Sequence, residues 1–451
     1  MVDPTWDMAK ESLGEGHSGT GARAGWTHKQ AERIERTDDT VAPIVYPPAT
    51  EQIPEVHIWD TWFLRNRDGT LAEVDGYRVC FSLTAPSDLL PGKRHDVATI
   101  RCFYSDDGRT WHNAGPVFED ALGQRQWAGS ALYDDDGSVY LFYTAAGEDG
   151  ADDLTYTQRI VGAEGGSIDT TDGFELSGPW THHELLTPDG ERYEREDQSR
   201  GMIYTFRDPW FFEDPETGET WLLFEANTPV PEGSDVCGGD DALQEFNGSV
   251  GIARSPTGDP LEWELEDPLL DAVGVNQELE RPHIVYRDGL YYLFISSHLH
   301  TFAPGLEGFD ALYGFVAEDL RGEYVPLNES GLVATNPENA PFQSYSWMAF
   351  PHGEEVLVQS FFNYYDFDGE TLDEIAHLPE SEQMRRFGGS LGPTLRLDVE
   401  GSRTHIIGTL GHWHIPLAGE TLPPTDRELI RRGKQDAGSG SYHTQTESES
   451  Q

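Results

Sequence analysis

Residues 288–294, Asp-Gly-Leu-Tyr-Tyr-Leu-Phe, place an Asp-Gly turn directly before a run of aromatic and apolar residues. Asp-Gly between strand-like runs is the usual signal for a β-hairpin. Similar turn-then-strand segments recur along the chain, at 75–79, 136–142, 217–224 and 352–358. Further strand-like runs and turns follow them, so each repeat predicts about four strands. The pattern therefore predicts five similar β units, with no long helices in the core.

Five four-stranded units favour an all-β fold, a five-bladed β-propeller with its site in a central axial pocket. The first strand of each blade lines the central channel, and radial repetition leaves only short exposed edges. A β-sandwich is the main alternative, but the repeat count and the likeness of the units favour the propeller. We expect one catalytic domain at 51–422, an N-terminal lead-in packed on it at 1–50 with a short helix near 27–34, and a polar, disordered tail at 423–451.

Acidic motifs stand where three of the first strands are expected, at 58–62, 206–210 and 278–282. They contribute Asp60, Asp208 and Glu280, with Trp59, Arg207, Glu278 and Arg281 beside them. The other two first strands are expected to carry Trp127, Ala128 and Ser130, and Tyr345 and Ser346. Strands around one axis would aim these side chains into a single pocket. Aromatic rings that pack on a sugar ring, and charged groups that bind its hydroxyls, suit a carbohydrate.

Each acidic motif also has a structural explanation when it is taken alone. Residues 207–209 are more often an ion pair beside a turn, 278–280 a solvated strand edge, and 59–60 a core aromatic beside a turn. Their combination at repeat-equivalent positions favours catalysis instead. Retaining glycosyl transfer needs a nucleophilic carboxylate and a protonated acid about 5–5.5 Å apart. A third carboxylate can stabilise the positive charge that develops on the sugar.

With these motifs the chain resembles the levansucrase and inulosucrase family, the fructansucrases that act on sucrose. The Val-Trp-Asp-Ser-Trp type motif of that family is matched at 58–62, Arg-Asp-Pro at 207–209, Phe-Glu-Ala-Asn-Thr at 224–228 and Glu-x-Glu-Arg at 278–281. Trp-Ser-Gly-Ser-Ala is nearly matched at 127–131, and Tyr-Ser-x-x-Ala-x-Pro is matched at 345–351. The resemblance runs in order from about Trp26 to about Leu410. It implies a sucrose-dependent fructosyltransferase that needs no cofactor.

The resemblance also implies a role for each residue. Asp60 would be the nucleophile, Glu280 the acid and base, and Asp208 the stabiliser of the transition state. The fructosyl subsite would contain Trp59, Trp127, Ser130 and Arg207, and the glucose or acceptor side Glu278, His298 and Tyr345, while Arg281 would orient the carboxylates. Glu280 must be protonated at the first step, so burial and Glu278 are expected to raise its pKa.

Four positions depart from the family pattern. Ala128 stands where a serine is expected beside Trp127, so one hydrogen bond to the nucleophile would be lost. His298 follows a strand where many members carry an acceptor-side arginine. Gln277 and Met202 stand where some bacterial members have calcium ligands, so we expect no equivalent calcium site.

The charge balance of the chain is extreme. Eighty-one acidic residues against 30 Lys and Arg give a formal net charge of −51, and the acids are spread along the whole chain. A nucleic-acid partner is excluded, because phosphate binding needs clustered basic residues. The surface repels itself at low ionic strength, and salt screens that repulsion. The composition therefore predicts a salt-requiring protein from a halophile, and together with the family resemblance we expect an archaeal source.

Location and product are less constrained by the sequence. No stretch approaches the roughly 20 apolar residues of a membrane helix, so no membrane partner is expected. The first 30 residues lack a signal-peptide pattern, whereas the resemblance implies work outside the cell. The expected partners are sucrose and fructan or oligosaccharide acceptors; the oligomeric state stays open. A β-fructofuranosidase and a non-catalytic sugar-binding propeller are the alternative functions. The motifs do not distinguish a β(2→1) from a β(2→6) linkage in the product, and we slightly favour β(2→1).

Overall fold

A computed structural model of the chain describes residues 25–425, and almost all of its regular structure is β-strand. This confirms the all-β prediction. The strands fall into five sets of four, in which each strand pairs with the next. The sets are β1 (Val56–Arg65), β3 (Tyr77–Pro86), β4 (Thr99–Ser105) and β5 (His112–Pro116); β6 (Arg125–Tyr133), β7 (Val139–Ala146), β8 (Gln158–Asp169) and β10 (Thr181–Leu186); β11 (Phe206–Glu213), β12 (Thr220–Asn227), β13 (Gly248–Arg254) and β14 (Glu264–Leu265); β16 (Glu280–Arg287), β17 (Leu290–Ser297), β18 (Ala311–Ala317) and β19 (Val325–Pro326); β21 (Ser344–His352), β22 (Glu355–Tyr364), β24 (Pro393–Glu400) and β25 (Arg403–His412).

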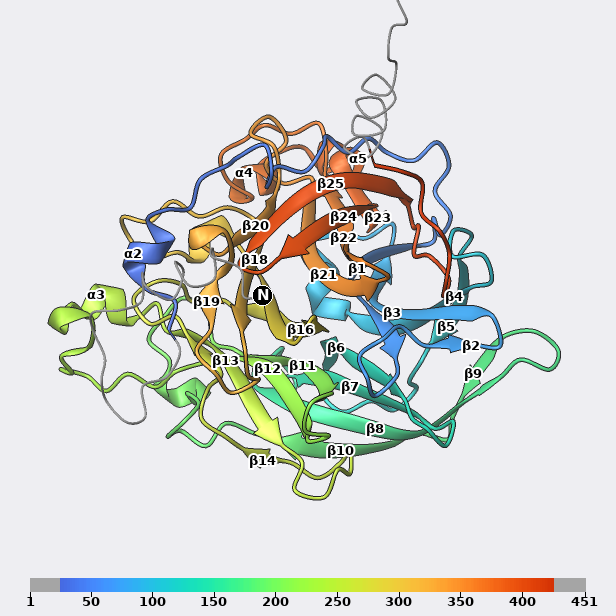
Figure 1. Ribbon diagram of the computed structural model, residues 1–451, viewed down its shortest axis with the longest axis horizontal. Coiled ribbons are helices and arrows are strands. Elements are labelled where there is room, and N and C mark those ends of the chain that lie inside the picture. Colours follow the sequence, from blue (N-terminus) through green and yellow to red (C-terminus); the bar gives the residue numbers. More distant parts are fainter. Residues whose placement is uncertain (1–24, 426–451) are drawn as a thin grey trace, which may run out of the picture.

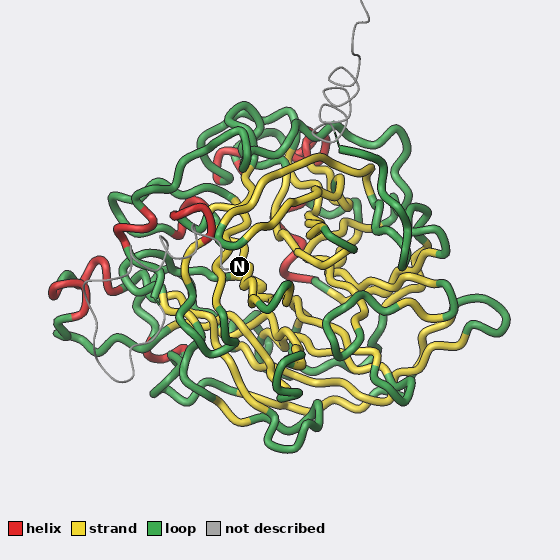
Figure 2. The backbone as a smooth tube through the Cα atoms, viewed as in Figure 1, coloured by secondary structure: helices red, strands yellow, loops and turns green. Residues whose placement is uncertain are grey.

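Each set carries one short accessory strand, and short helices lie in the connections. The accessory strands are β2 (Glu73–Val74), β9 (Glu175–Ser177), β15 (Leu270–Asp271), β20 (Leu332–Thr335) and β23 (Phe387–Leu391). The helices are α2 (His28–Ala31), α3 (Asp241–Gln244), α4 (Asp373–Ala376), α5 (Glu380–Arg386), η1 (Pro91–Val97), η2 (Glu196–Gln198), η3 (Val236–Gly239), η4 (Leu299–Thr301) and η5 (Leu327–Glu329). Figure 2 shows the strands as the body of the molecule, with loops over its surface.

The first strands of the five sets gather around the middle of the molecule (Figure 1). Neighbouring first strands contact one another in the order β1, β6, β11, β16 and β21, and β21 contacts β1 again. A parallel pairing between β1 and β6 joins the first two sets into one sheet. This closed order is what the five-unit repeat predicts, and on it we interpret the propeller as five-bladed.

The Asp-Gly turn at 288–289 adopts the backbone conformation that a tight hairpin needs. Asp288 and Gly289 form the two-residue connection between β16 and β17, with φ of 53° and 78°. Two left-handed residues in succession are what the favoured hairpin turn needs, and Asp-Gly tolerates that conformation. The strands behind the turns are buried on both faces, since every residue of β12 is buried, and so is every residue of β17 and of β22 after the first. This explains why they appear in the sequence as continuous apolar runs rather than as alternating patterns.

The lead-in packs on the propeller over its described part. Helix α2 lies within the predicted 27–34 segment, and Thr27 caps its N-terminus. A bridge between Val41 and Thr335 and a hydrogen bond from the Ile406 backbone N to Asp39 O at 2.9 Å tie this segment to the fourth and fifth sets. The predicted disordered tail falls mostly at 426–451, outside the described residues.

Candidate active site

Every first strand has an irregularity at the same point along its length. The pairing with the second strand shifts between Trp59 and Trp62, Trp127 and Gly129, Arg207 and Trp210, Glu280 and His283, and Tyr345 and Met348. In four of the five strands the residue at the bulge is left-handed, with φ of 48° at Asp60, 60° at Asp208, 51° at Arg281 and 55° at Ser346. A β-bulge re-aims side chains, so the five bulges form a ring of redirected residues around the axis.

The bulges correct the predicted equivalence of the three acids. Asp60 and Asp208 are themselves the left-handed bulge residues, whereas Glu280 is the residue before its bulge. The repeat partner of the two aspartates in the fourth set is Arg281, not Glu280. The distance along the sequence to the hairpin turn does not reveal this shift, because the connections after β11 and β16 differ in length. Glutamate is one methylene longer than aspartate, which suits a carboxylate placed one residue earlier.

Arg281 lies at the centre of the three acids. The carboxylates of Asp60, Asp208 and Glu280 all act electrostatically on its buried guanidinium. That guanidinium donates to Ser346 O at 2.9 Å and to Ser346 Oγ at 2.5 Å, and also to Thr61 O. The Arg281 backbone N donates to Asp208 Oδ2 at 3.1 Å. The structure therefore brings the three predicted carboxylates together around one cation that also joins β1, β16 and β21.

Glu280 has the environment of an acid that stays protonated. Burial raises the pKa of its carboxyl to about 7, and the Glu278 carboxylate adds to the rise while His298 and Arg207 oppose it. The Tyr345 hydroxyl donates to Glu280 Oε2, and Arg207 Nη2 donates to Glu280 Oε1 at 3.3 Å. The group can therefore give and take a proton near neutral pH.

Asp208 is a second buried carboxyl whose pKa is raised. Burial raises its pKa to about 6, the positive charge of Arg207 opposes that rise, and the charge of Asp60 adds to it. Its backbone N donates to Thr144 Oγ1 at 2.9 Å, which fixes the bulge against β7. Carboxyls whose pKa values are raised by burial and by neighbouring charges are typical of functional sites.

Arg207 binds a cluster of carboxylates that includes Glu225, a residue for which the sequence predicts no role. Its guanidinium donates to Glu225 Oε2 at 2.7 Å and to Glu278 Oε1 at 2.9 Å, besides its contact with Glu280. Glu225 is fully buried and pairs directly opposite Arg207 on β12. Burial raises the pKa of Glu225, whereas Arg207 lowers it. Sequence reasoning matched 224–228 as a motif but gave Glu225 no role; its place in an apolar strand was the available signal.

His298 is a cation beside the acid. Its ring stacks on Tyr345 with centroids 3.7 Å apart, and Nε2 lies 4.0 Å from Glu280 Oε2. Nδ1 bonds to Asp310 Oδ2 at 3.0 Å, and Asp310 itself is buried. Burial disfavours the charged ring, but Asp310 and the two glutamates outweigh it and raise the pKa of His298 to about 9. Asp310 was not predicted, since nothing near it in the sequence marks it as the partner of His298.

Aromatic rings complete the site. The Trp59 ring meets His95 edge-on at 5.4 Å, Arg94 lies 5.4 Å from the same ring, and Arg125 lies 5.5 Å from the Trp127 ring. Within residues 25–425, several buried polar atoms of the site have no hydrogen-bond partner, among them Trp59 Nε1, Trp127 Nε1 and Glu278 Oε2. Unpartnered buried donors and acceptors are expected where a polar ligand binds.

Ser130 and Gln277, two positions singled out in the sequence, form hydrogen bonds with backbone groups of the protein. The Ser130 hydroxyl accepts a hydrogen bond from the Phe211 backbone N at 3.0 Å, which ties β6 to β11. The Gln277 side chain accepts from the Met202 backbone N at 3.1 Å and donates to Ile203 O at 3.0 Å. An amide thus binds backbone where the resemblance places a calcium ligand in other proteins. The lack of that calcium site stays a prediction.

Comparison with known proteins identifies the family. The levansucrase/invertase family matches residues 17–416. The chain belongs to this family. It is 35% identical over 425 residues to a levansucrase of Rahnella aquatilis, covering 87% of this chain and 96% of that protein. It is 34% identical over 411 residues to an extracellular sucrase of Zymomonas mobilis, covering 87% and 94%.

A solved structure shares the fold over its full length. The inulosucrase from Halalkalicoccus jeotgali bound to kestose is 64% identical, with a TM-score of 0.88 over 90% of this chain and all of that one. The family and these relatives make the chain an enzyme of the fructansucrase type. Within residues 25–425 no helix is long and apolar enough to cross a membrane.

Proposed function

We propose that the chain transfers the fructosyl group of sucrose to a growing fructan by two displacements at one carbon. The observation that carries this proposal is the cluster of Asp60, Asp208 and Glu280 around Arg281, in which burial and the charge of Glu278 raise the pKa of Glu280 to about 7. The family and the relatives support the substrate and the reaction class.

In the first step Asp60 attacks C2 of the fructosyl group. The bond from C2 to the bridging oxygen breaks, and Glu280 gives its proton to that oxygen, so glucose leaves. Asp208 accepts hydrogen bonds from the fructosyl hydroxyls and favours the positive charge that develops in the transition state. The product of this step is an ester between the Asp60 carboxylate and C2.

In the second step an acceptor hydroxyl gives its proton to Glu280 and attacks C2, and the ester to Asp60 breaks. Two inversions at one carbon retain the configuration. If the acceptor is sucrose or fructan, the sugar product grows by one fructosyl unit. If the acceptor is water, fructose is released. Tyr345 and His298 lie against Glu280, and Glu278 shares the guanidinium of Arg207 with it. These are therefore the groups that an acceptor would meet.

We further propose a β(2→1), inulin-type product. Its support is the 64% identity to an inulosucrase solved with kestose. Secretion is likewise proposed, on the name of the Zymomonas relative. That relative is called a sucrase, so hydrolysis is the second candidate function.

The test is to incubate the full chain with sucrose in concentrated salt and to analyse the sugars by NMR. The proposal expects free glucose in excess of free fructose, together with oligosaccharides that contain β(2→1) linkages. Glucose and fructose in equal amounts, with no oligosaccharide, would establish the hydrolase instead. Oligosaccharides with β(2→6) linkages alone would overturn the linkage while leaving the transfer reaction in place.

A further inference from the structure

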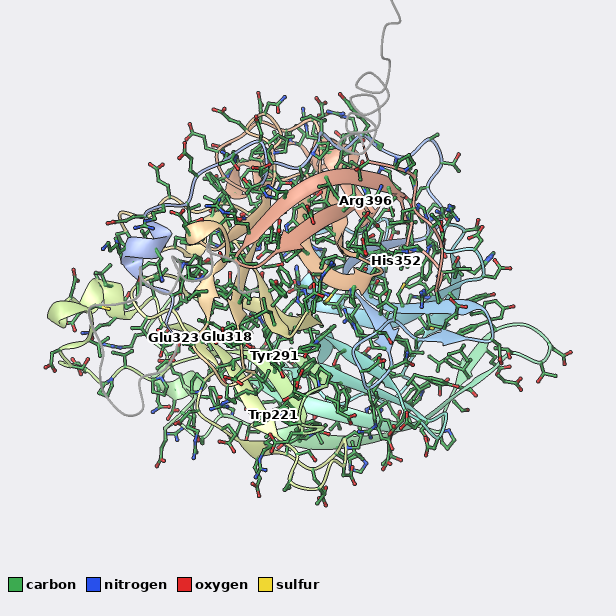
Figure 3. The ribbon with its side chains drawn as sticks, viewed as in Figure 1. Trp221, Tyr291, Glu318, Glu323, His352 and Arg396 are labelled. Atoms are coloured by element: carbon green, nitrogen blue, oxygen red, sulfur yellow. The ribbon has the colours of Figure 1, made fainter. Side chains whose placement is uncertain are left out.

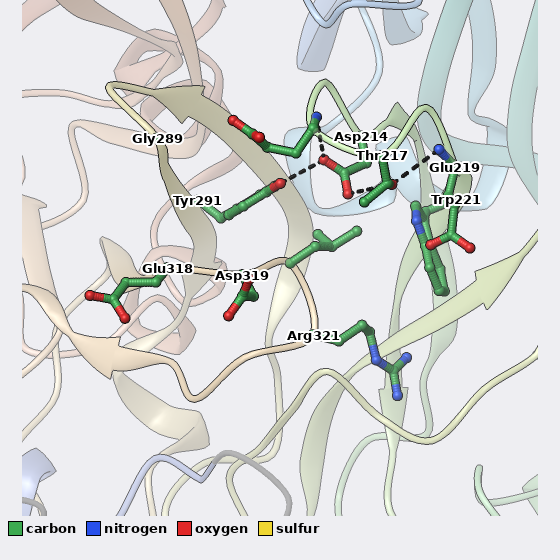
Figure 4. A pocket seen from close by; sticks show the side chains of 11 residues that line it. Asp214, Thr217, Glu219, Trp221, Gly289, Tyr291, Glu318, Asp319 and Arg321 are labelled. Carbon is green, nitrogen blue, oxygen red and sulfur yellow. Dashed lines mark hydrogen bonds between the residues drawn. The ribbon is translucent and has the colours of Figure 1, made fainter.

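A cavity of ≈ 440 Å³ lies between the third and fourth strand sets, away from the carboxylate cluster. Its walls come from the β11–β12 hairpin, the start of β17 and the loop after β18 (Figure 4). Asp208 is near the start of β11, whereas Asp214 of the cavity follows the end of that strand. Six residues of strand span about 20 Å. The cavity therefore opens at the opposite end of the propeller from the catalytic groups.

The volume of the cavity falls within the about 300–1,000 Å³ that is typical of small-molecule pockets. Two buried aromatic residues, Trp221 and Tyr291, form part of its wall, and both lie in the same region of the molecule in Figure 3. Aromatic side chains with polar tips are common in such sites, because they offer an apolar face and a hydrogen-bonding group together.

The acidic groups of the wall are largely engaged with the protein. Asp214 accepts from the Tyr291 hydroxyl at 2.6 Å, from Thr217 Oγ1 at 2.7 Å and from the Glu216 backbone N at 3.0 Å. Glu219 lies 3.6 Å from Arg254, and Glu216 accepts from the Tyr286 hydroxyl. These carboxylates are therefore poor candidates to wrap around a bare cation, which would have to displace their present partners.

The unused groups of the wall are donors. Trp221 is 5% exposed, and its Nε1 is buried without a hydrogen-bond partner within residues 25–425. Arg321 is exposed, and its guanidinium carbon lies 5.8 Å from the Trp221 ring. A buried indole N–H without an acceptor is unfavourable, so a ligand that offers acceptor oxygens would stabilise this site.

The surrounding charge restricts what that ligand can be. Asp214, Glu216, Glu219, Glu318 and Asp319 line the cavity with Arg321 as the one cation among its lining residues. An anionic ligand would be repelled by the excess of carboxylates. A cation gains nothing from indole and guanidinium donors. A neutral molecule with many hydroxyls accepts from those donors and donates to the remaining carboxylate oxygens.

We propose that this cavity is a second binding site for a neutral oligosaccharide. The inference rests on the proposed function, because the enzyme makes such molecules. A fructan held at that end of the propeller by one part of its length, with the rest passing over the outside of the fold, stays near the enzyme. Its free end then meets the active site at a raised effective concentration. The site would favour the extension of long products over release of short ones.

The test uses the full chain with Asp60→Asn, which is expected to keep the fold and to lose turnover, and kestose as the probe in molar KCl. Titration calorimetry is expected to resolve two binding events. Adding Arg321→Gln or Trp221→Phe should weaken one of them about tenfold, the loss of one hydrogen bond to a charged or buried donor. Arg109→Gln, which changes an exposed arginine at the same end of the first set, should change neither event.

A single binding event, or a second event that neither Arg321→Gln nor Trp221→Phe weakens, overturns the inference. So does a heat of binding with CaCl₂ alone that Trp221→Phe abolishes while kestose gives none. In the wild-type background, Arg321→Gln should leave the initial rate of sucrose consumption unchanged and shorten the products. Failure of the proposed function would appear differently, as a wild-type chain that consumes no sucrose.

Discussion

Glu278 and His298 have opposite effects on the pKa of Glu280. The negative charge of Glu278 raises the pKa of Glu280, and the positive charge of His298 lowers it. Burial lowers the pKa of His298, but Asp310, a residue with no contact to Glu280 among those described, outweighs that effect together with the two glutamates, so His298 is cationic. The proton affinity of the acid is thus set by a pair of neighbours whose removal should have opposite effects.

The first prediction follows from that pair. Proton donation needs the protonated acid, so activity is present below the pKa of Glu280 and is lost as pH rises through about 7. Glu278→Gln removes a negative charge and should move this alkaline limb to lower pH. Asp310→Asn should leave His298 neutral at pH 7. The pKa of Glu280 is then no longer lowered by the charge of His298, so the alkaline limb should move to higher pH. Profiles of kcat against pH for both variants provide the measurement.

Equal shifts in one direction, or no shift in either variant, would contradict the assignment of Glu280 as the titrating acid. Thermal unfolding of the two variants provides the control, because a general loss of structure would lower activity at every pH without moving the limb.

At the scale of single elements, the bulges in the first strands determine where the chemistry stands. The repeat, the hairpin turns and the three acids were predictable, because Asp-Gly turns and apolar runs depend on local residue types. The bulges were not predictable, since a shift of pairing depends on the neighbouring strand. For that reason Glu280 was assigned the same repeat position as Asp60 and Asp208, and Arg281, which holds that position, was given a lesser role. Long-range partners such as Asp310 were missed for a similar reason.

The second prediction concerns Gly129, in the bulge of β6. A Cβ built on Gly129 would stand 1.8 Å from the carbonyl oxygen of Phe142 on β7. Gly129→Ala must therefore push the two strands apart, and we expect a loss of about 1–3 kcal/mol in the free energy of unfolding. Denaturant unfolding provides the measurement. Gly411→Ala in β25 is the matched control, because nothing lies within 4 Å of its added Cβ. Equal stability of the two variants would show that β6 and β7 are not packed as described.

At the scale of the whole molecule, the acidic surface is the dominant feature. A formal charge of −51 on 451 residues places many carboxylates within one Debye length of each other in dilute buffer, where that length is about 30 Å at 0.01 M. Their mutual repulsion opposes the compact state. The fold is therefore expected to depend on dissolved salt as well as on its packed strands.

The third prediction is that the thermal unfolding midpoint rises steeply between dilute buffer and molar KCl. The rise should be of similar size in NaCl and KCl, because screening depends on ionic strength rather than on a particular cation. Calorimetric scans across a salt series provide the measurement. A midpoint that does not change with salt would show that the surface charge has little effect on stability.

The central claim is that Asp60 becomes covalently attached to the fructosyl group while Glu280 acts as its acid and base. Rapid acid quenching of the full chain during turnover of sucrose, followed by mass spectrometry of its peptides, tests this most directly. The account predicts that the peptide containing Asp60 gains the mass of one fructosyl group, and that Asp60→Asn abolishes both the adduct and turnover. An adduct on the peptide that carries Asp208 or Glu280, or full activity in Asp60→Asn, would contradict it.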